Sequence, residues 1–303
     1  MTDRLAAHTR AAAALARLDD AALTALLDEA RPHGAGIGGA SVLLEVDGVR
    51  VFAKRVALTD LERRPEHRHS TRNLFGLPTY YQYGIGSAGF GAWRELAAHT
   101  LTTDWVLAGA YPGFPLLHHW RELPGSPSTE GAYDAFGGLD GAVGHWEDSP
   151  AVRRRLEAIR DASASIVLFL EYVPHTLGSW LAAGRDGDFV RPQLAEGTAF
   201  MSSCGFVHFD AHPANILTDG RRLYFADFGL ALSADFDLSP AEADFLADHL
   251  PSYDLANALS HLTPEPADEH AASLANDFHR ALLRQDKRTP YPAAAIARAL
   301  AAR

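Results

Sequence analysis

Cysteine, lysine and long apolar runs are all scarce in this chain of 303 residues. The single cysteine, Cys204, excludes an internal disulfide and a cysteine-rich zinc site, which fits a reducing, cytoplasmic environment. Residues 1–30 are rich in alanine, but charged residues interrupt them, so we expect neither a secretory signal nor a membrane span there. The formal net charge of -11 argues against nucleic acid or an anionic membrane as the main partner.

Two short motifs follow one another in the second half of the chain. His208, Asp210 and Asn215 stand in the order H-x-D-x-x-x-x-N, and Asp227-Phe228-Gly229 begins twelve residues after the asparagine. The apolar runs between them flank Asp219-Gly220, a dipeptide suited to a tight turn. We therefore expect a small hairpin that holds the two carboxylates close together.

The residue types in these motifs suit phosphoryl transfer. That reaction needs a carboxylate to orient the acceptor hydroxyl and accept its proton, and oxygen ligands to hold Mg²⁺ on a triphosphate. Asp210 is the candidate base. Asn215 and Asp227 are the candidate metal ligands.

With these motifs the chain resembles the protein-kinase-like superfamily. His212 stands two residues after Asp210, where protein kinases usually carry lysine. In this it is similar to the aminoglycoside and other antibiotic phosphotransferases, whose loop typically reads H-G-D-x-H-x-x-N, although Phe209 replaces their glycine. The resemblance implies that Asp210, His212 and His208 are the catalytic residues. His212 either contacts the transferred phosphate or is a polar loop residue.

Lysine is so rare here that Lys54 draws notice, because only Lys54 and Lys287 occur among 27 basic residues. Lys54 lies in an alternating segment, 51–54, after a glycine cluster and an Asp-Gly turn. This is the order of a glycine-rich loop followed by a strand with a phosphate-binding lysine. Glycines let backbone N–H groups approach phosphate oxygens. The candidate nucleotide-binding residues are Gly36, Gly38, Gly39, Ser41 and Lys54.

The lysine needs a carboxylate to orient it. Glu95, in a well-patterned helical segment, is the first candidate, and Glu62 is the alternative. Two irregular stretches, about 58–91 and 112–148, are predicted to be insertions. We expect the first to be solvated and the second to be a loop or lid, and contact of the first with phosphate or substrate is the alternative.

Residues 166–170 predict a buried strand that runs into Glu171-Tyr172-Val173-Pro174. This tetrad resembles the hinge of kinases, where backbone groups of Glu171 and Val173 would bind adenine. Pro174 would stop the strand from continuing. An ordinary strand end is the alternative.

Only nine residues separate Gly229 from Ser239, which begins a helix with a capping box. This leaves no room for a long activation segment. Four acids follow the metal-binding motif, and we expect them either to face a cationic acceptor or to be solvated. These acids are Asp235, Asp237, Glu242 and Asp244. Asp254 is predicted to cap the next helix.

The predicted fold is α+β and bilobal, of the protein-kinase-like kind. An N-lobe with an antiparallel sheet spans residues 1–172 and a mainly helical C-lobe spans 173–303. The expected activity is ATP- and Mg²⁺-dependent phosphorylation of a hydroxyl on a small molecule, such as an antibiotic or another cationic or polyhydroxylated metabolite, by a monomer or weak dimer. A serine/threonine protein kinase and a non-catalytic scaffold remain the alternatives, and neither the acceptor nor the choice of ATP over GTP can be read from the sequence.

Overall fold

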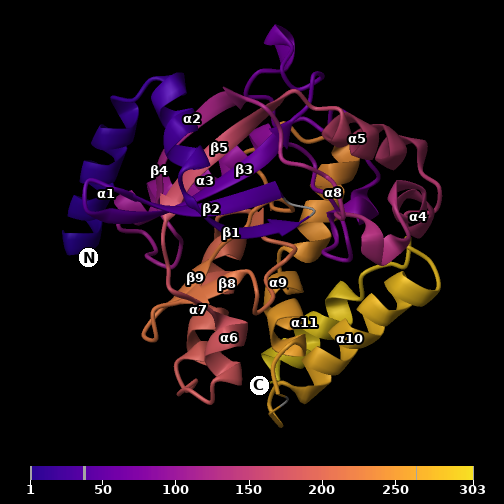
Figure 1. The fold of residues 1–303 in the computed structure, drawn as a ribbon. Coiled ribbons are helices and arrows are strands. Elements are labelled where there is room, and N and C mark those ends of the chain that lie inside the picture. The colour runs from indigo at the N-terminus through magenta and orange to yellow at the C-terminus, as the bar shows by residue number, and fades with distance from the viewer. Residues whose placement is uncertain (1, 37–38, 264, 303) are drawn as a thin grey trace.

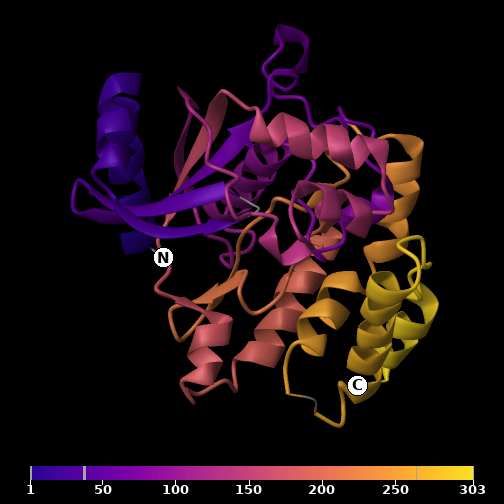
Figure 2. The same cartoon turned by 45° about the vertical axis from the view of Figure 1, so that its right-hand side comes forward.

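The computed structural model describes residues 2–36, 39–263 and 265–302. It is an α+β structure with a five-stranded antiparallel sheet and many helices, so the predicted class is confirmed. The sheet lies in the upper part of the molecule and most C-terminal helices lie below it (Figures 1 and 2). The kinase-like kind of fold and the lobe boundary after Tyr172 stay predictions.

The sheet has the strand order β1-β2-β3-β5-β4, with antiparallel neighbours throughout. Its strands are β1 (Arg31–Gly36), β2 (Gly39–Val46), β3 (Val49–Leu58), β4 (Leu117–Pro124) and β5 (Ala164–Glu171). Asp47 and Gly48, both with positive φ, form the turn from β2 to β3, as the Asp-Gly pair predicts. The glycine cluster near residue 36 is therefore the end of a β1–β2 hairpin, of which the sequence predicted only the second strand.

Helices cover both faces of this sheet, which makes β5 a fully buried strand. They are α1 (Thr2–Ala16), α2 (Asp20–Asp28) and α3 (Ala92–Leu107). Val167 and Phe169 of β5 pack in the cluster with α1 and α2. Ile166 and Leu168 point to the other face and pack in the cluster with α3. Because side chains alternate along a strand, the uninterrupted apolar run of β5 is what a strand between two helical layers requires.

The two predicted insertions pack against each other rather than extending into solvent. Their elements are η1 (Pro65–His67), η2 (Thr79–Gln82), η3 (Asp134–Phe136) and α4 (Leu139–His145), followed by α5 (Pro150–Arg160). Phe75, Tyr81 and Phe90 from the first stretch share a core with Trp146 from the second. Burial of these aromatic side chains shows that a fully solvated insertion was the wrong expectation for 58–91. Strand β4 also takes up part of the predicted loop 112–148.

The C-terminal part is mainly helical and carries short strand pairs close to the two motifs. Its helices are α6 (Leu177–Ala182), α7 (Val190–Ser203), α8 (Pro240–His249), α9 (Tyr253–Ser260), α10 (Glu269–Arg284) and α11 (Ala293–Ala301). Its strands are β6 (His175–Thr176), β7 (Phe206–Val207), β8 (Ile216–Thr218), β9 (Leu223–Phe225) and β10 (Leu232–Ser233). Strands β8 and β9 pair antiparallel, which is the hairpin predicted between the two motifs.

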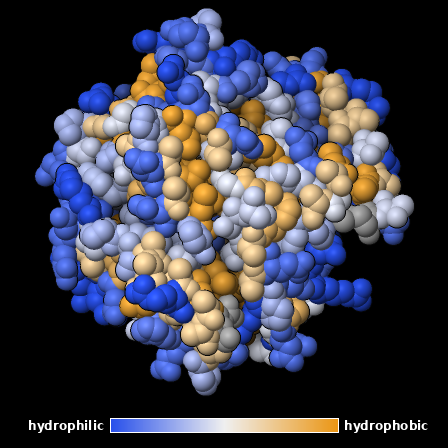
Figure 3. All heavy atoms as spheres, turned by 180° about the vertical axis from the view of Figure 1, so that it is seen from behind, coloured by the Kyte–Doolittle hydropathy of each residue, from blue (hydrophilic) through white to orange (hydrophobic). Residues whose placement is uncertain are grey.

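The face opposite to that of Figure 1 carries hydrophilic residues along much of its rim, with smaller groups of apolar residues between them (Figure 3). Among the residues that the structure describes, no helix is long and apolar enough to cross a membrane.

Candidate active site

Lys54 on β3 joins two carboxylates from distant parts of the chain. Its Nζ lies 2.7 Å from Glu95 Oε1 on α3 and 2.7 Å from Asp227 Oδ1, just after β9. The Lys54 and Glu95 side chains are only 10% and 4% exposed, whereas that of Asp227 is 44% exposed. Burial disfavours the charged ammonium, but the two carboxylates outweigh it and raise the pKa of Lys54 above its ordinary value. The lysine is therefore charged, and Asp227 keeps an oxygen that faces the solvent.

Glu95, and not Glu62, is the partner of Lys54. Glu62 pairs instead with Arg155 on α5 at 2.9 Å, and both side chains are 2% exposed. Its second oxygen accepts the N–H of Ala92, at the start of α3, at 2.7 Å. Gly91, the N-cap residue of α3, has no side chain to satisfy that donor. Glu62 thus anchors the helix that carries Glu95.

Asp210 and Asn215 lie in contact in the loop before β8. Asn215 Nδ2 donates to Asp210 Oδ2 at 2.8 Å, and the Asn215 amide oxygen, which bonds no described residue, can bind a cation. Burial, with the charge of Asp227 as a second cause, raises the pKa of Asp210 to about 7. A carboxyl with that pKa is half ionised near neutral pH, as suits a general base.

His208 is fully buried, and both ring nitrogens are occupied. Nε2 donates to the Ala226 carbonyl at 2.9 Å, and Nδ1 accepts the Asp210 N–H at 3.3 Å. Burial lowers its pKa to about 4, so the ring is neutral. His208 therefore links the two loops that carry Asp210 and Asp227, and this geometry corrects the direct catalytic role that the sequence assigned to it.

His212 borders the same cleft as Asp210. Its Nδ1 accepts the Ala214 N–H at 3.2 Å, and its Nε2 lies 3.6 Å from Asp210 Oδ1. Burial lowers the pKa of His212, which favours the neutral form with the proton on Nε2. The ring therefore presents an N–H donor beside Asp210.

Phe209, which departs from the glycine of the antibiotic phosphotransferases, has a φ of 64°. This left-handed conformation suits glycine and strains a bulky residue. The ring is fully buried, however, and lies 5.0 Å from the Tyr253 ring and 5.4 Å from the Phe245 ring, centroid to centroid. Asp254 accepts the N–H groups of His208 and Phe209 at 2.7 and 3.0 Å. Asp254 therefore holds the backbone of this loop in place. The sequence predicted only a helix cap for Asp254 and did not predict this contact.

The predicted nucleotide loop is only partly described. Gly36 ends β1, Gly38 lies outside the described residues, and Gly39 opens β2 and borders the cleft. A Cβ at Gly39 would overlap the Arg55 carbonyl oxygen on β3, so strand packing alone requires this glycine. Ser41 lies opposite Lys54 in the register and donates its hydroxyl to the Gly34 carbonyl at 3.3 Å.

The predicted hinge lies at the end of β5, away from this cleft. The Glu171 carboxylate is held by Arg4 of α1 at 2.6 Å and by the Leu116 N–H at 3.1 Å. Val173 makes no hydrogen bond within the described part of the chain. Neither Glu171 nor Val173 is among the residues around the cleft, so their role at adenine stays a prediction.

A second glycine-rich segment, 84–91, was missed as part of the site. It reads G-I-G-S-A-G-F-G, and it directly precedes α3. A Cβ at Gly84 would overlap Asp210 Oδ1, and one at Gly89, where φ is 73°, would lie 2.6 Å from the Gly229 carbonyl oxygen. The closely spaced glycines just before a helix could have indicated a site in the sequence. The contact between Gly84 and Asp210 could not have been predicted from it.

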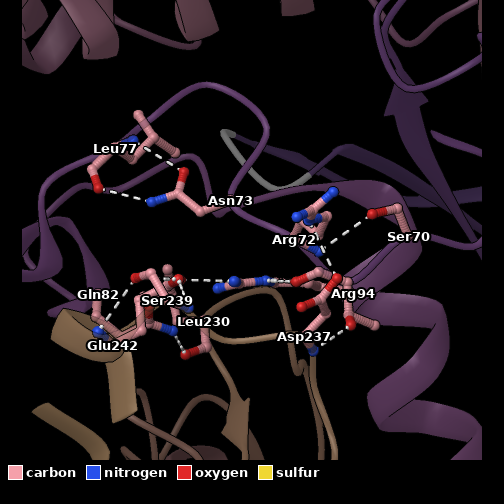
Figure 4. A network of polar contacts seen from close by, with 11 residues as sticks. Ser70, Arg72, Asn73, Leu77, Gln82, Arg94, Leu230, Asp237, Ser239 and Glu242 are labelled. Carbon is pink, nitrogen blue, oxygen red and sulfur yellow. Dashed lines mark hydrogen bonds and ion pairs between the residues drawn. The ribbon is translucent and has the colours of Figure 1, made fainter. Parts of the chain in front are cut away.

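The same insertion and helix α3 together hold the segment that follows Gly229 (Figure 4). Arg94 on α3 forms a buried ion pair with Glu242 on α8 at 2.6 Å, and Arg72 pairs with Asp237 at 3.1 Å. Gln82 donates to the Leu230 carbonyl. Asp237 and Glu242 are therefore engaged by arginines.

None of the four acids after Gly229, for which contact with a cationic acceptor and solvation were the two alternatives, borders the cleft, among the residues that the structure describes. These acids therefore give no support to a cationic acceptor, and the nature of the acceptor stays a prediction.

The cleft that these groups surround has a volume of about 250 Å³. It brings together Lys54, Glu95, Asp210, Asn215 and Asp227, and segments 84–91 and 127–133 from the insertions form its other wall. Within the described ranges, no group of three or more His, Cys, Asp or Glu side chains could hold a metal ion. A cation here would thus depend on Asn215 and Asp227 with ligands from elsewhere.

Comparison with known proteins gives one weak relationship. The chain matches none of the protein-family models. A stretch of 95 residues, 30% of this chain, is 28% identical to the probable CTD kinase subunit alpha homolog of Encephalitozoon cuniculi (strain GB-M1). The similar region spans 28% of that protein's length. This is a weak similarity to a kinase subunit, and the resemblance to the antibiotic phosphotransferases stays a prediction.

Proposed function

We propose that this chain is a phosphotransferase that uses ATP and Mg²⁺ to phosphorylate a hydroxyl of a small molecule, within a kinase-like fold of two lobes. The observation that carries the proposal is the position of Lys54, 2.7 Å from both Glu95 and Asp227. Three elements far apart in sequence converge on that ammonium. An ion triad beside a buried base and a free amide oxygen suits the binding of a metal–triphosphate.

Each residue then has a distinct part in the transfer. Lys54, oriented by Glu95, binds phosphate oxygens as a point charge. Asp210 orients the acceptor hydroxyl and receives its proton as the oxygen attacks the γ-phosphorus. His212 donates from Nε2 to the transferred group. Asn215 holds Asp210 in place through its 2.8 Å hydrogen bond.

Mg²⁺ would be held by the amide oxygen of Asn215 and the half-exposed carboxylate of Asp227. Two oxygen ligands from the protein suit Mg²⁺, which commonly takes its remaining ligands from phosphates and water. When bound, the ion neutralises the charge that develops on the phosphates.

A small-molecule acceptor is supported by the shape of the site. Only nine residues lie between Gly229 and Ser239, and the first insertion contacts them through Arg72, which pairs with Asp237, and Gln82, which donates to the Leu230 carbonyl. Segments of the two insertions form the wall beyond Asp210. This arrangement leaves little open surface on which an extended protein segment could dock.

The second candidate is a protein kinase, which the similarity to a kinase subunit favours. The test is a screen of metabolites and antibiotics, alongside peptides and folded proteins, for a mass gain of one phosphate that depends on ATP. We expect transfer to a small molecule by the wild type and none by Asp227→Ala. Preferred phosphorylation of a folded protein would favour the protein kinase, and the absence of Mg²⁺-ATP binding would favour a non-catalytic scaffold.

A further inference from the structure

The cleft extends along β3 away from the predicted hinge. Besides Lys54 it is bordered by Val56 and Ala57, which pair with the start of β5, whereas Glu171 ends that strand. Its far wall comes from segments 84–91 and 127–133. Gly84 of this wall contacts Asp210, the proposed base. An acceptor hydroxyl within reach of Asp210 would therefore lie in the part of the cleft that this wall borders.

Among the described residues, none of the wall residues that border the cleft carries a charge, since Glu130 of segment 127–133 is exposed and does not border it. Arg155 of α5, which borders the cleft beside the wall, is paired with Glu62 at 2.9 Å and also donates to the Gly89 carbonyl at 3.3 Å. Burial raises the pKa of Tyr133 to about 12, so its phenol is neutral. The ionised groups of the cleft therefore belong to the phosphate and metal end, at Lys54 and the carboxylates around it.

Hydroxyl groups, by contrast, are plentiful on this wall. Tyr133 is only 7% exposed, it borders the cleft, and its hydroxyl makes no hydrogen bond with any described residue. The Thr129 hydroxyl is likewise unbonded within the described ranges. Ser87 and Ser128 accept the N–H groups of Gly89 and Glu130 at 3.2 and 3.1 Å; the Ser87 hydroxyl also bonds Tyr81, whereas that of Ser128 retains a proton to donate. The Tyr133 and Thr129 hydroxyl oxygens are open to the cleft rather than sealed from water, so a ligand in the cleft can bond them directly.

We propose that this wall is the acceptor subsite, and that it takes an uncharged small molecule with several hydroxyls, which Tyr133 and Thr129 bind by hydrogen bonds. This inference rests on the proposed phosphotransferase activity. One acceptor oxygen forms a bond to the γ-phosphorus of ATP, and the bond from that phosphorus to the β-bridging oxygen breaks. The hydroxyl proton goes to Asp210, and ADP leaves. A cation or anion would gain no partner on this wall and would lose its hydration there.

The first experiment compares acceptors of similar size and shape in which one hydroxyl-bearing position is replaced by an amine or a carboxylate. Purified protein with Mg²⁺-ATP is given small alcohols in matched sets, such as glucose, glucosamine and glucuronate, or myo-inositol and an aminocyclitol, and products are detected by mass. We expect the neutral member of a set to have a kcat/KM about tenfold or more above its charged analogues. Preference for an amine or a carboxylate overturns the inference, as does preference for a serine peptide.

The proposed function can fail separately from the subsite. Absence of Mg²⁺-ATP binding by calorimetry defeats the phosphotransferase activity itself. If ATP binds and Asp227-dependent hydrolysis is measured, but no neutral alcohol is phosphorylated, only the assignment of the acceptor subsite is overturned.

Variants locate the subsite. Tyr133→Phe and Thr129→Val each remove one hydroxyl with little change in shape, and we expect each to raise the acceptor KM about 3- to 10-fold while the KM for ATP and the melting temperature stay unchanged. Tyr111→Phe is the matched control, because Tyr111 is also buried and its hydroxyl is unbonded among the described residues, yet it lies outside the cleft. Equal effects of Tyr133→Phe and Tyr111→Phe on the acceptor KM would contradict the inference.

Discussion

The two glycine-rich segments of this chain look alike in sequence and differ in what they contact. In 34–41 the glycines end one strand and begin another, and Gly39 packs against the backbone of β3. In 84–91 the glycines lie against the residues of the candidate active site, with Gly84 at Asp210 and Gly89 at Gly229. A glycine pattern therefore indicates close approach, but the neighbour that it approaches has to be seen in three dimensions.

The largest expected effect is the loss of kcat when a carboxylate of the cleft, Asp210 or Asp227, is removed. Asp210→Ala and Asp227→Ala should each lower kcat by roughly 10³-fold or more, because one removes the base and the other a metal ligand. Circular dichroism and thermal melting should show an intact fold. A correctly folded Asp227→Ala enzyme that remains active would refute the metal assignment.

The next effect separates the two glycine segments directly. An alanine methyl at Gly84 overlaps Asp210, so Gly84→Ala should lower kcat by about 10- to 100-fold through displacement of the base. At Gly34 the nearest atom to such a methyl is Ser41 Oγ at 3.5 Å, an ordinary contact, so Gly34→Ala is the matched control. Steady-state kinetics on both variants make the comparison. Equal activities would mean that segment 84–91 does not position Asp210.

Loss of the buried ion pair between Arg94 and Glu242, next to segment 84–91, should lower the stability of the protein. Arg94→Met leaves Glu242 buried without its partner and should lower the free energy of unfolding by about 3–5 kcal/mol. Because α3 also carries Glu95, kcat should fall as well. In a Glu95→Gln background, Arg94→Met should cause no further loss of kcat, but it should still lower the free energy of unfolding. Additive effects on kcat, measured in a double-mutant cycle, would show that Arg94 does not act through Glu95.

A smaller effect is expected from acid, because several histidines are buried in the neutral form. Burial lowers the pKa of His99 on α3 to about 3, well below the ordinary value of about 6.5. Below pH 6.5 the unfolded chain binds a proton that the folded chain does not, so stability falls as the pH drops from 6.5 toward 3. His99 should account for roughly 2 kcal/mol of this loss at pH 5. Urea unfolding of wild type and His99→Leu at pH 5 and 7.5 measures it. A His99→Leu protein with the same loss of stability as the wild type would contradict the assignment.

The smallest effect is expected at the exposed acids after the metal-binding motif. Asp237 pairs with Arg72, and both side chains are more than half exposed, so Asp237→Asn should change stability by no more than about 1 kcal/mol. The acceptor KM should be insensitive to Asp235→Asn, to Asp237→Asn and to salt. A KM that rises with salt in the wild type and not in these variants would restore the cationic acceptor.

Much of the fold and of the candidate site follows from local sequence. The buried strand at 166–170, the hairpin between the motifs and the Asp-Gly turn before Lys54 depend on residues close in sequence, where periodicity and turn chemistry are informative. The insertions were harder to interpret. Their apolar residues, such as Phe75 and Trp146, come from segments far apart, so neither segment shows a complete core by itself.

The sequence by itself determined which candidate residues flank one short hairpin, because Asp210, Asn215 and Asp227 occupy fixed positions around it, and their types suit the proposed phosphoryl transfer. Only the tertiary structure decided what surrounds them. It paired Lys54 with Glu95, gave Glu62 to Arg155, and brought Gly84 to Asp210. The physical reason is that glycine has no side chain, so its place in the sequence does not reveal which distant group packs against it. A buried carboxylate likewise pairs with whichever cation the packing of distant helices brings within reach.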